Sequence, residues 1–160
     1  GERLDLTCLA FNLLMTSFGM PLIHSGTEFY RTKFRNDNSY NAGDAVNAVN
    51  WTLKSQYCLL LEHVKQLIQF RLKTGLFSLK PDAIRRGFEP IEADCLAYSI
   101  RQEKTQYAFY HNPGDVHLVL HGLDRKNVQV VLDGLKWYPP LEIPIKVPAK
   151  GTLILKQNMQ

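Results

Sequence analysis

A polar stretch between positions 31 and 51 carries the side chains with the clearest potential for chemistry. A hydroxyl-rich ligand such as a sugar is held by hydrogen-bond donors and acceptors fixed in direction, and by a flat apolar face that covers its ring. Tyr40 offers such a face, and the directed groups are the side chains of Asn38, Asn41, Asp44 and Asn47. The same residue types also form Asx-turns and left-handed positions in any long loop. Sugar binding and a purely structural role therefore both remain open.

Groups for covalent or acid–base catalysis are not found at a recognisable spacing. Glu28, Asp37 and Asp44 have no partner acid that would make a catalytic carboxylate pair. Neither a nucleophile elbow nor a phosphate-binding glycine loop is present in the sequence. We therefore predict no catalytic residue in this chain.

Metal binding is a second chemistry to consider. No Cys and His pair has the spacing of a metal site, and His111, His117 and His121 fall within predicted strands. A metal site among these histidines is one interpretation, and hydrogen-bonded surface histidines are the favoured one.

The cysteines are odd in number and lie in apolar runs, which favours buried free thiols in a reducing compartment and slightly favours the cytoplasm. They are Cys8, Cys58 and Cys95.

The composition is that of an ordinary soluble globular protein. Of the 160 residues, 45% are hydrophobic and 21% are charged, and the formal net charge is +4. The basic residues form only short groups next to acids, so we expect no nucleic-acid partner. No apolar run reaches the roughly 18 residues that span a bilayer, so we expect no membrane insertion. The opening Gly1-Glu2-Arg3-Leu4 resembles the interior of a chain, and we expect the true N-terminus to lie upstream.

Helical periodicity dominates the first 80 residues. Apolar side chains over residues 2–18 cover nearly every face of a helix, which predicts a helix buried on several sides. The apolar run 20–24 is too short for a helix and is typical of a strand buried on both faces of a parallel sheet. A long loop over 31–51 and a second helix over 55–73 follow. Residues 1–80 thus hold one and a half α/β units.

Short β-rich runs separated by turn residues dominate the rest of the chain. Residues 81–94 read as a linker, with one helical turn at 82–86. Beyond it, the spacing of turn residues predicts an antiparallel β-sandwich domain over 95–160. Its strands are expected at Cys95–Gln102, Gln106–His111, Val116–His121, Val128–Leu132, Ile143–Val147 and Thr152–Lys156.

The segment from Gly19 to Phe29 resembles the eighth barrel strand of the α-amylase superfamily. The residues after it resemble the loop that follows this strand in type I pullulanases. They are Arg31-Thr32-Lys33, Asn38-Ser39-Tyr40-Asn41, Gly43-Asp44, Asn47 and Asn50-Trp51. The helix over 62–77 and the strands after residue 95 also match the last barrel helix and the C-terminal β-sandwich of that family. The resemblance covers nearly the whole chain, strongly to about residue 80 and more loosely afterwards.

This resemblance implies a fold and a parent activity. The fold would be an α/β remnant of a (β/α)8 barrel at 1–80, a linker at 81–94 and an antiparallel β-sandwich at 95–160. The parent would be a starch- or glycogen-debranching glycoside hydrolase that cleaves α-1,6-glucosidic bonds with retention of configuration. Retaining hydrolysis needs a nucleophilic carboxylate and a carboxylic acid about 5 Å apart. In this superfamily those groups lie on earlier barrel strands, so the chain on its own is predicted to be inactive.

The resemblance also implies a role for particular loop residues. Asp44 would accept hydrogen bonds from glucose hydroxyls on the non-reducing side of the cleaved bond, because ligands of such barrels meet the loops after the strands. The neighbouring contacts or supports would be Arg31, Asn38, Tyr40 and Asn47. Glu28 would be structural and paired with Arg31. Thr27 and Ala48 depart from the residues usual at these positions, so the details of the subsite are left open. The two tryptophans, Trp51 and Trp137, are expected in the core.

The expected partners follow from the same resemblance. They are an α-glucan such as pullulan, starch or glycogen oligosaccharides, and either the missing N-terminal part of the barrel or a second copy of the chain. No cofactor is expected in this chain, and calcium is compatible with the complete enzyme. Two alternatives stay open: a stand-alone glucan-binding or interaction β-sandwich without activity, and a degenerate hydrolase relative kept for assembly.

Overall fold

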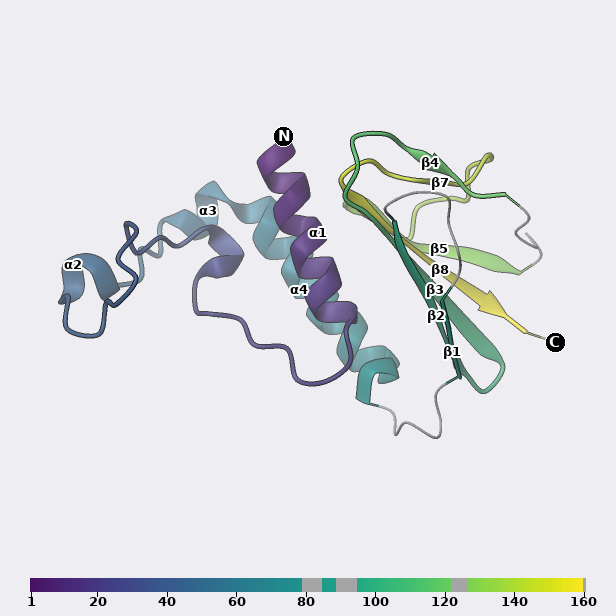
Figure 1. Cartoon of the computed structure of the whole chain (residues 1–160), viewed down its shortest axis with the longest axis horizontal. Helices are drawn as coiled ribbons and strands as arrows, with labels where there is room; N and C mark the ends of the chain where they lie inside the picture. The colour runs from purple at the N-terminus through teal and green to yellow at the C-terminus, as the bar shows by residue number, and fades with distance from the viewer. Residues whose placement is uncertain (79–84, 89–94, 122–126, 160) are drawn as a thin grey trace.

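The computed structural model describes residues 1–78, 85–88, 95–121 and 127–159, with the backbone alone for 85–88. Its elements form layers, with two long helices on one side of a large sheet and a small second sheet on the other (Figure 1). The chain runs through the helices first and the strands afterwards, as the change in periodicity near residue 80 predicts. No helix in the described part of the chain is long and apolar enough to cross a membrane.

The two long helices are α1 (Glu2–Thr16) and α4 (Cys58–Thr74). The predicted helix 2–18 is confirmed to within two residues. The predicted helix 55–73 is interrupted at Tyr57, which separates the short α3 (Leu53–Gln56) from α4. Gly75 ends α4 in the left-handed conformation, where its N–H donates to the carbonyl of Arg71. The helices pack together through the buried side chains Cys8, Phe11, Met15, Leu60, Val64 and Leu67.

Between the long helices the chain forms short helical turns and irregular loops. The turns are η1 (Thr27–Phe29), α2 (Asp44–Asn47) and α3. The strand expected at residues 20–24 does not form, so that prediction is wrong for this structure. Met20 and Leu22 are 94% and 88% exposed there. A strand buried on both faces needs pairing partners at both edges, and no described segment pairs with this one. The barrel remnant is therefore not confirmed.

The large sheet has six antiparallel strands in the order β1-β2-β3-β8-β5-β6, and β4 pairs with β7 in the small sheet. The bounds are β1 (Arg85–Phe88), β2 (Leu96–Gln102), β3 (Thr105–Asn112), β4 (Leu118–Val119), β5 (Val128–Asp133), β6 (Lys136–Trp137), β7 (Lys146–Val147) and β8 (Gly151–Asn158). Each of the six predicted strands overlaps one of these. Antiparallel strands in two sheets are compatible with the predicted sandwich, although helices cover the other face of the large sheet.

Two strands were not predicted. β6 is a two-residue strand that closes a hairpin with β5, too short to leave a periodic signal. β1 occupies residues 85–88, so the helical turn predicted at 82–86 is wrong at its last two positions, where the backbone pairs with β2 instead. The remainder of that turn and the rest of the predicted linker 81–94 lie outside the described residues.

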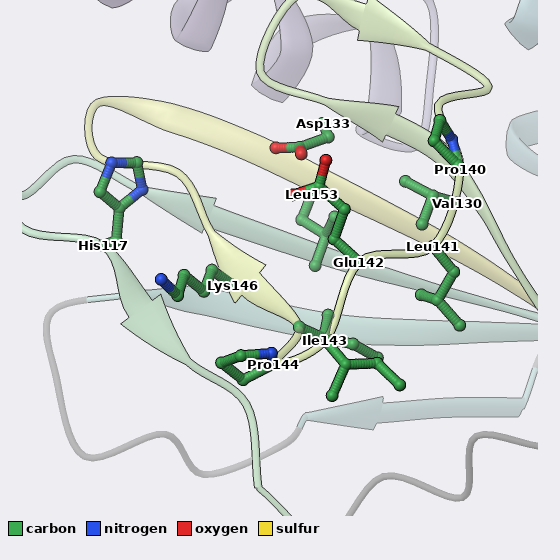
Figure 2. Close-up of a pocket in the computed structure, with 11 residues that line it drawn as sticks. His117, Val130, Asp133, Pro140, Leu141, Glu142, Ile143, Pro144, Lys146 and Leu153 are labelled. Atoms are coloured by element: carbon green, nitrogen blue, oxygen red, sulfur yellow. The ribbon is translucent and has the colours of Figure 1, made fainter.

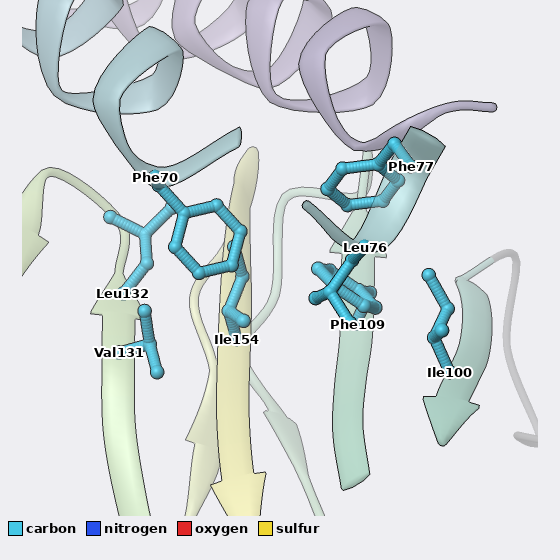
Figure 3. Packing of buried hydrophobic residues seen from close by; sticks show 8 residues of the cluster. All are labelled: Phe70, Leu76, Phe77, Ile100, Phe109, Val131, Leu132 and Ile154. Atoms are coloured by element: carbon cyan, nitrogen blue, oxygen red, sulfur yellow. The ribbon is translucent and has the colours of Figure 1, made fainter. Parts of the chain in front are cut away.

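Both faces of the large sheet are buried. One face contacts Phe70 of α4 and Leu76 and Phe77 of the following turn η2 (Leu76–Ser78), as Figure 3 shows. The sheet residues on this face are Ile100, Phe109, Val131, Leu132 and Ile154. The opposite face packs under the small sheet through Ala97, Tyr110, Leu120, Val130, Ile145, Val147, Leu153 and Leu155. Alternate residues of β2, β3 and β8 therefore serve different cores.

A β-bulge in β5 breaks this alternation. The pairing of β5 with β8 shifts between Val130 and Leu132, so the consecutive residues Val131 and Leu132 both join the core against α4. A bulge inserts one unpaired residue and redirects side chains in this way.

Buried polar contacts join the helices to the sheet. His111 is 1% exposed, and its two ring nitrogens lie 2.9 Å from Thr152 Oγ1 and 3.3 Å from Thr16 Oγ1. His63 of α4 lies with Nε2 2.8 Å from Asn12 Oδ1, and Trp137 donates to its Nδ1. Burial lowers the pKa of each histidine to about 4. His111 is thus not the surface histidine that we expect from sequence, whereas His117 and His121 are exposed.

The cysteines also differ from expectation. Cys8 is buried, and burial raises the pKa of its thiol to about 12, with a further rise from Asp5. Cys58 is exposed and Cys95 is half-buried, so buried thiols are confirmed only for Cys8. Among the described residues, no three His, Cys, Asp or Glu side chains are grouped in a way that could hold a metal ion.

Candidate functional site

The predicted sugar-binding residues lie in the connection between α1 and α4. In Figure 1 the part of this connection that contains α2 extends beyond the helix pair, on the side away from the sheet. Near the start of this connection Phe29 of η1 is 1% exposed, and η1 contacts α4.

A tight turn at residues 25–31 positions the start of the loop. Gly26 has a φ of 92°, its N–H donates to Glu28 Oε2, and its carbonyl accepts from the N–H of Arg31. A Cβ atom at this glycine would lie 2.7 Å from Cβ of Arg31, so the turn requires glycine both for its conformation and for space. The expected pairing of Glu28 with Arg31 is wrong, because the Glu28 carboxylate is occupied by the turn itself. Arg31 donates instead to the carbonyls of Ser25 and Asn47.

Lys33 holds the two sides of the loop together. Its Nζ donates to Ser39 Oγ at 2.6 Å and to Asn47 Oδ1 at 2.9 Å. Asn47 Nδ2 donates in turn to the carbonyl of Ser39 at 2.7 Å. These contacts span 6 to 14 residues, so no local spacing in the sequence could have revealed the role of Lys33. Arg31 and Asn47 are thereby placed as half-buried supports of the loop.

The other three predicted residues are exposed. Tyr40 is 92% exposed, and Asn38 and Asp44 are also exposed. The backbone N–H of Asn38 donates to Asn36 Oδ1, which forms an Asx-turn and directs this part of the loop. Asp44 begins α2 directly after Gly43, whose φ is 69°. Arg31, Lys33 and Asn47 thus stabilise a loop from which an aromatic ring, an amide and a carboxylate project.

Trp51 stands at the end of the same loop. It is 62% exposed, so the prediction that it lies in the core is wrong. One face contacts Phe29, with ring centroids 6.0 Å apart, and Lys54 Nζ lies 5.1 Å from its ring centre. Trp137, by contrast, is half-buried between the helices and the sheet, as expected for a core residue.

A cavity of about 510 Å³ lies between the beginnings of α1 and α4. Tyr30 and Tyr57 form part of its wall, with their rings edge to face, and the Arg3 guanidinium lies 4.4 Å from the Tyr30 ring centre. None of the five predicted site residues lines this cavity. Of the five predicted residues, Asn38, Tyr40 and Asp44 are exposed on the loop surface, and Arg31 and Asn47 are half-buried beneath them.

Comparison with characterised proteins connects this geometry to known enzymes. The sequence is 28% identical over 145 residues to a pullulanase of Bacillus subtilis, which covers 87% of this chain and 18% of that protein. It is 41% identical over 59 residues to an isoamylase of a Flavobacterium species, covering 37% of the chain and 8% of the relative. No protein-family model matches the sequence.

Solved structures show the same similarity in three dimensions. A pullulanase of Bacillus acidopullulyticus matches 97% of this chain with a TM-score of 0.80 and 27% identity, over 20% of its own length. A pullulanase of Paenibacillus barengoltzii complexed with maltohexaose and α-cyclodextrin matches 98% with a TM-score of 0.80 and 25% identity, over 26% of its length.

The chain spans about a fifth of the length of the B. subtilis pullulanase that it matches. The resemblance to pullulanases that the sequence indicates is confirmed. Over most of its length this chain matches pullulanases in sequence and in fold, which is consistent with the C-terminal part of such an enzyme.

Proposed function

We propose that this chain is the C-terminal part of a debranching glycoside hydrolase that acts on α-glucans, and that its loop over 31–51 contributes to the substrate-binding surface. The observation that carries the proposal is the match to pullulanases over nearly the whole chain, loop included. Solved pullulanases with this fold are complexed with maltotetraose and maltohexaose, which supports an α-glucan as the ligand class. The rest of the barrel, with the catalytic acids, would come from the portion of the enzyme that precedes this one.

Within the loop, we assign sugar contacts to the exposed residues and structural support to the half-buried ones. Asp44 accepts hydrogen bonds from sugar hydroxyls, Tyr40 covers the apolar face of a ring, and Asn38 supplies a directed amide. Arg31 and Asn47 act through the loop, since their side chains are engaged with backbone groups and with Lys33. The segment 20–24 becomes a buried strand only when neighbouring barrel strands are present to pair with it.

The stand-alone sugar-binding module remains a second candidate. The core under the small sheet is built entirely from residues 95–155, which favours a sheet that needs no further domain on that face. The core on the other face shares Phe70, Leu76 and Phe77 with the helical part, which favours a single unit with the preceding residues.

The test of the loop is Asp44→Ala in the complete enzyme, with a branched maltooligosaccharide as substrate. Loss of a carboxylate that binds the transition state is expected to lower kcat/KM about tenfold or more, at an unchanged melting temperature. The matched control is Asp37→Ala, an exposed aspartate of the same loop, which should leave kcat/KM within about twofold. If Asp44→Ala behaves like the control, the loop does not contact substrate through Asp44.

A further inference from the structure

A second hollow lies on the sheet, on residues that the loop proposal does not use. It measures about 280 Å³ and opens beside the segment 140–146, as Figure 2 shows. Its wall contains the apolar residues Val130, Leu141, Ile145 and Leu153, together with two prolines. Val130, Ile145 and Leu153 belong to the buried core under the small sheet, so this wall is fixed by packing.

Four ionisable side chains surround the opening. They are His117, Asp133, Glu142 and Lys146, the last two from the segment 140–146 itself. Within the described residues, neither the Asp133 nor the Glu142 carboxylate accepts a hydrogen bond from another side chain or from the backbone. Burial raises the pKa of Asp133, with Glu142 adding to the rise and Lys136 and His117 opposing it. This carboxylate is therefore partly desolvated and still has unused acceptor capacity.

The four ionisable side chains at the opening limit the class of ligand that the pocket can bind. Two carboxylates disfavour a phosphate or another anion, since like charges repel. Lys146 and His117 at the same opening disfavour a divalent cation, and no metal-holding group of side chains is found in the described part of the chain. A neutral ligand that donates hydrogen bonds to the two carboxylates, accepts one from Lys146 and lays an apolar face on the wall fits this arrangement. His117 Nδ1 already accepts a hydrogen bond from the N–H of Ala149.

We propose that this pocket binds a single neutral pyranose ring, separately from the loop at 31–51. A volume near the lower end of the usual range for ligand pockets, about 300–1,000 Å³, fits one sugar residue better than a long chain. The ring hydroxyls donate to Asp133 and Glu142, and the C–H face lies against the apolar wall. The choice of an α-linked glucose residue rests on the proposed function, whereas the pyranose itself rests on the pocket.

The test is a titration with maltotriose of the isotope-labelled 160-residue chain carrying Met20→Lys and Leu22→Lys, two exposed positions outside the pocket whose substitution is expected to keep the chain monomeric. Binding is followed by the backbone amide signals of residues 133, 142 and 146. A small exposed site of this kind is expected to bind with a Kd of about 1 mM. Glucose is titrated in parallel: equal affinity means that a free ring suffices, and tighter binding of maltotriose means that the site takes a chain end. Saturable shifts at these three amides support the pocket in either case.

Variants make the titration specific. Glu142→Ala removes an exposed side chain, and Asp133→Asn keeps the shape of the turn with Gly134, so neither should unfold the protein. Each is expected to weaken maltotriose binding about tenfold. Glu103→Gln, an exposed acid outside the pocket, should leave binding unchanged. The proposal is overturned if the amide shifts are absent, if they survive Glu142→Ala, or if phosphate or calcium produces them more strongly than maltotriose.

The two proposals fail separately. The kcat/KM of the complete enzyme with Asp44→Ala tests the role of the loop. The amide shifts that maltotriose produces with Glu142→Ala test the pocket. A pocket that binds no sugar leaves the loop proposal intact, and an unaffected Asp44→Ala enzyme leaves the pocket intact.

Discussion

His63 and His111 are buried where the helices meet the sheet, and both are neutral in the folded chain because burial lowers each pKa from 6.5 to about 4. Between these values the unfolded chain binds protons that the folded chain excludes, so stability increases with pH there. We expect full stability above about pH 6.5, with a loss on the order of 3 kcal/mol per histidine as the pH falls to about 4. Urea unfolding at a series of pH values measures this slope.

The double variant His63→Gln and His111→Gln tests the source of the slope. It is expected to flatten the dependence of unfolding free energy on pH between about 4 and 6.5, whatever its effect on stability at neutral pH. His24→Gln is the control, since His24 is exposed and should leave the slope unchanged. An unaltered slope in the double variant would assign the acid sensitivity to other groups.

For single residues, the sequence predicts which side chains are available for binding better than it predicts which side chains contact one another. The polar loop and its exposed Tyr40 and Asp44 could be predicted, because long loops lie on the surface. The support by Lys33 could not, since its partners are distant in sequence and one of them is a residue expected to touch sugar, Asn47. The pocket acids Asp133 and Glu142 were missed for the same reason: only the fold brings them together.

The contact between α4 and the sheet is the element-scale feature on which the fold depends. Phe70 is 5% exposed and lies against Tyr107 and Trp137, with ring centroids 6.0 Å away in each case. Phe70→Ala should lower the free energy of unfolding by about 3–5 kcal/mol, through lost burial and the cavity left behind. Thermal or urea unfolding of the 160-residue chain measures the change.

Leu72→Ala is the matched control in the same helix. Leu72 is 75% exposed, and alanine favours a helix at least as well as leucine, so its stability should stay within about 0.5 kcal/mol of the parent. Equal effects of the two substitutions would mean that α4 does not pack on the sheet as described.

The elements themselves follow from the sequence to different degrees. Strands such as β3 and β8 are predicted because short β-rich runs are bounded there by turn residues, at Asn112-Pro113-Gly114-Asp115 after β3 and at Ala149-Lys150-Gly151 before β8. The bulge in β5 has no sequence signal, because it depends on pairing with β8. Residues 20–24 have the composition of a strand buried on both faces, yet Met20 and Leu22 are exposed and only Ile23 packs against a core. Burial on both faces requires partners that local composition does not supply.

At the scale of the whole molecule, the exposed apolar side chains of residues 20–24 favour association between copies of the chain. Met20 and Leu22 present apolar side chains at 94% and 88% exposure, and burial of apolar area is worth roughly 25 cal/mol per Å². We expect the isolated chain to self-associate at micromolar concentration, as measured by light scattering. The double variant Met20→Lys and Leu22→Lys should be monomeric over the same range without loss of stability, since neither side chain contributes to a core.

Val116→Lys is the control for a general effect of charge. Val116 is 71% exposed in the turn before β4, and its substitution should leave association unchanged. A parent chain that stays monomeric at these concentrations would show that the exposed segment drives no association.

The position of β8 has a consequence for how the protein is made. β8 pairs with β3 on one side and with β5 on the other, so it alone connects the β2–β3 hairpin to the β5–β6 hairpin within the described sheet. A ribosome delivers residues in order, at about 5–20 per second, so the strands of both hairpins are synthesised before the strand that joins them. In that interval their inner edges have unpaired backbone groups, which is the state in which nascent chains aggregate or recruit chaperones. The large sheet is thus completed only after residues 151–158 have been synthesised.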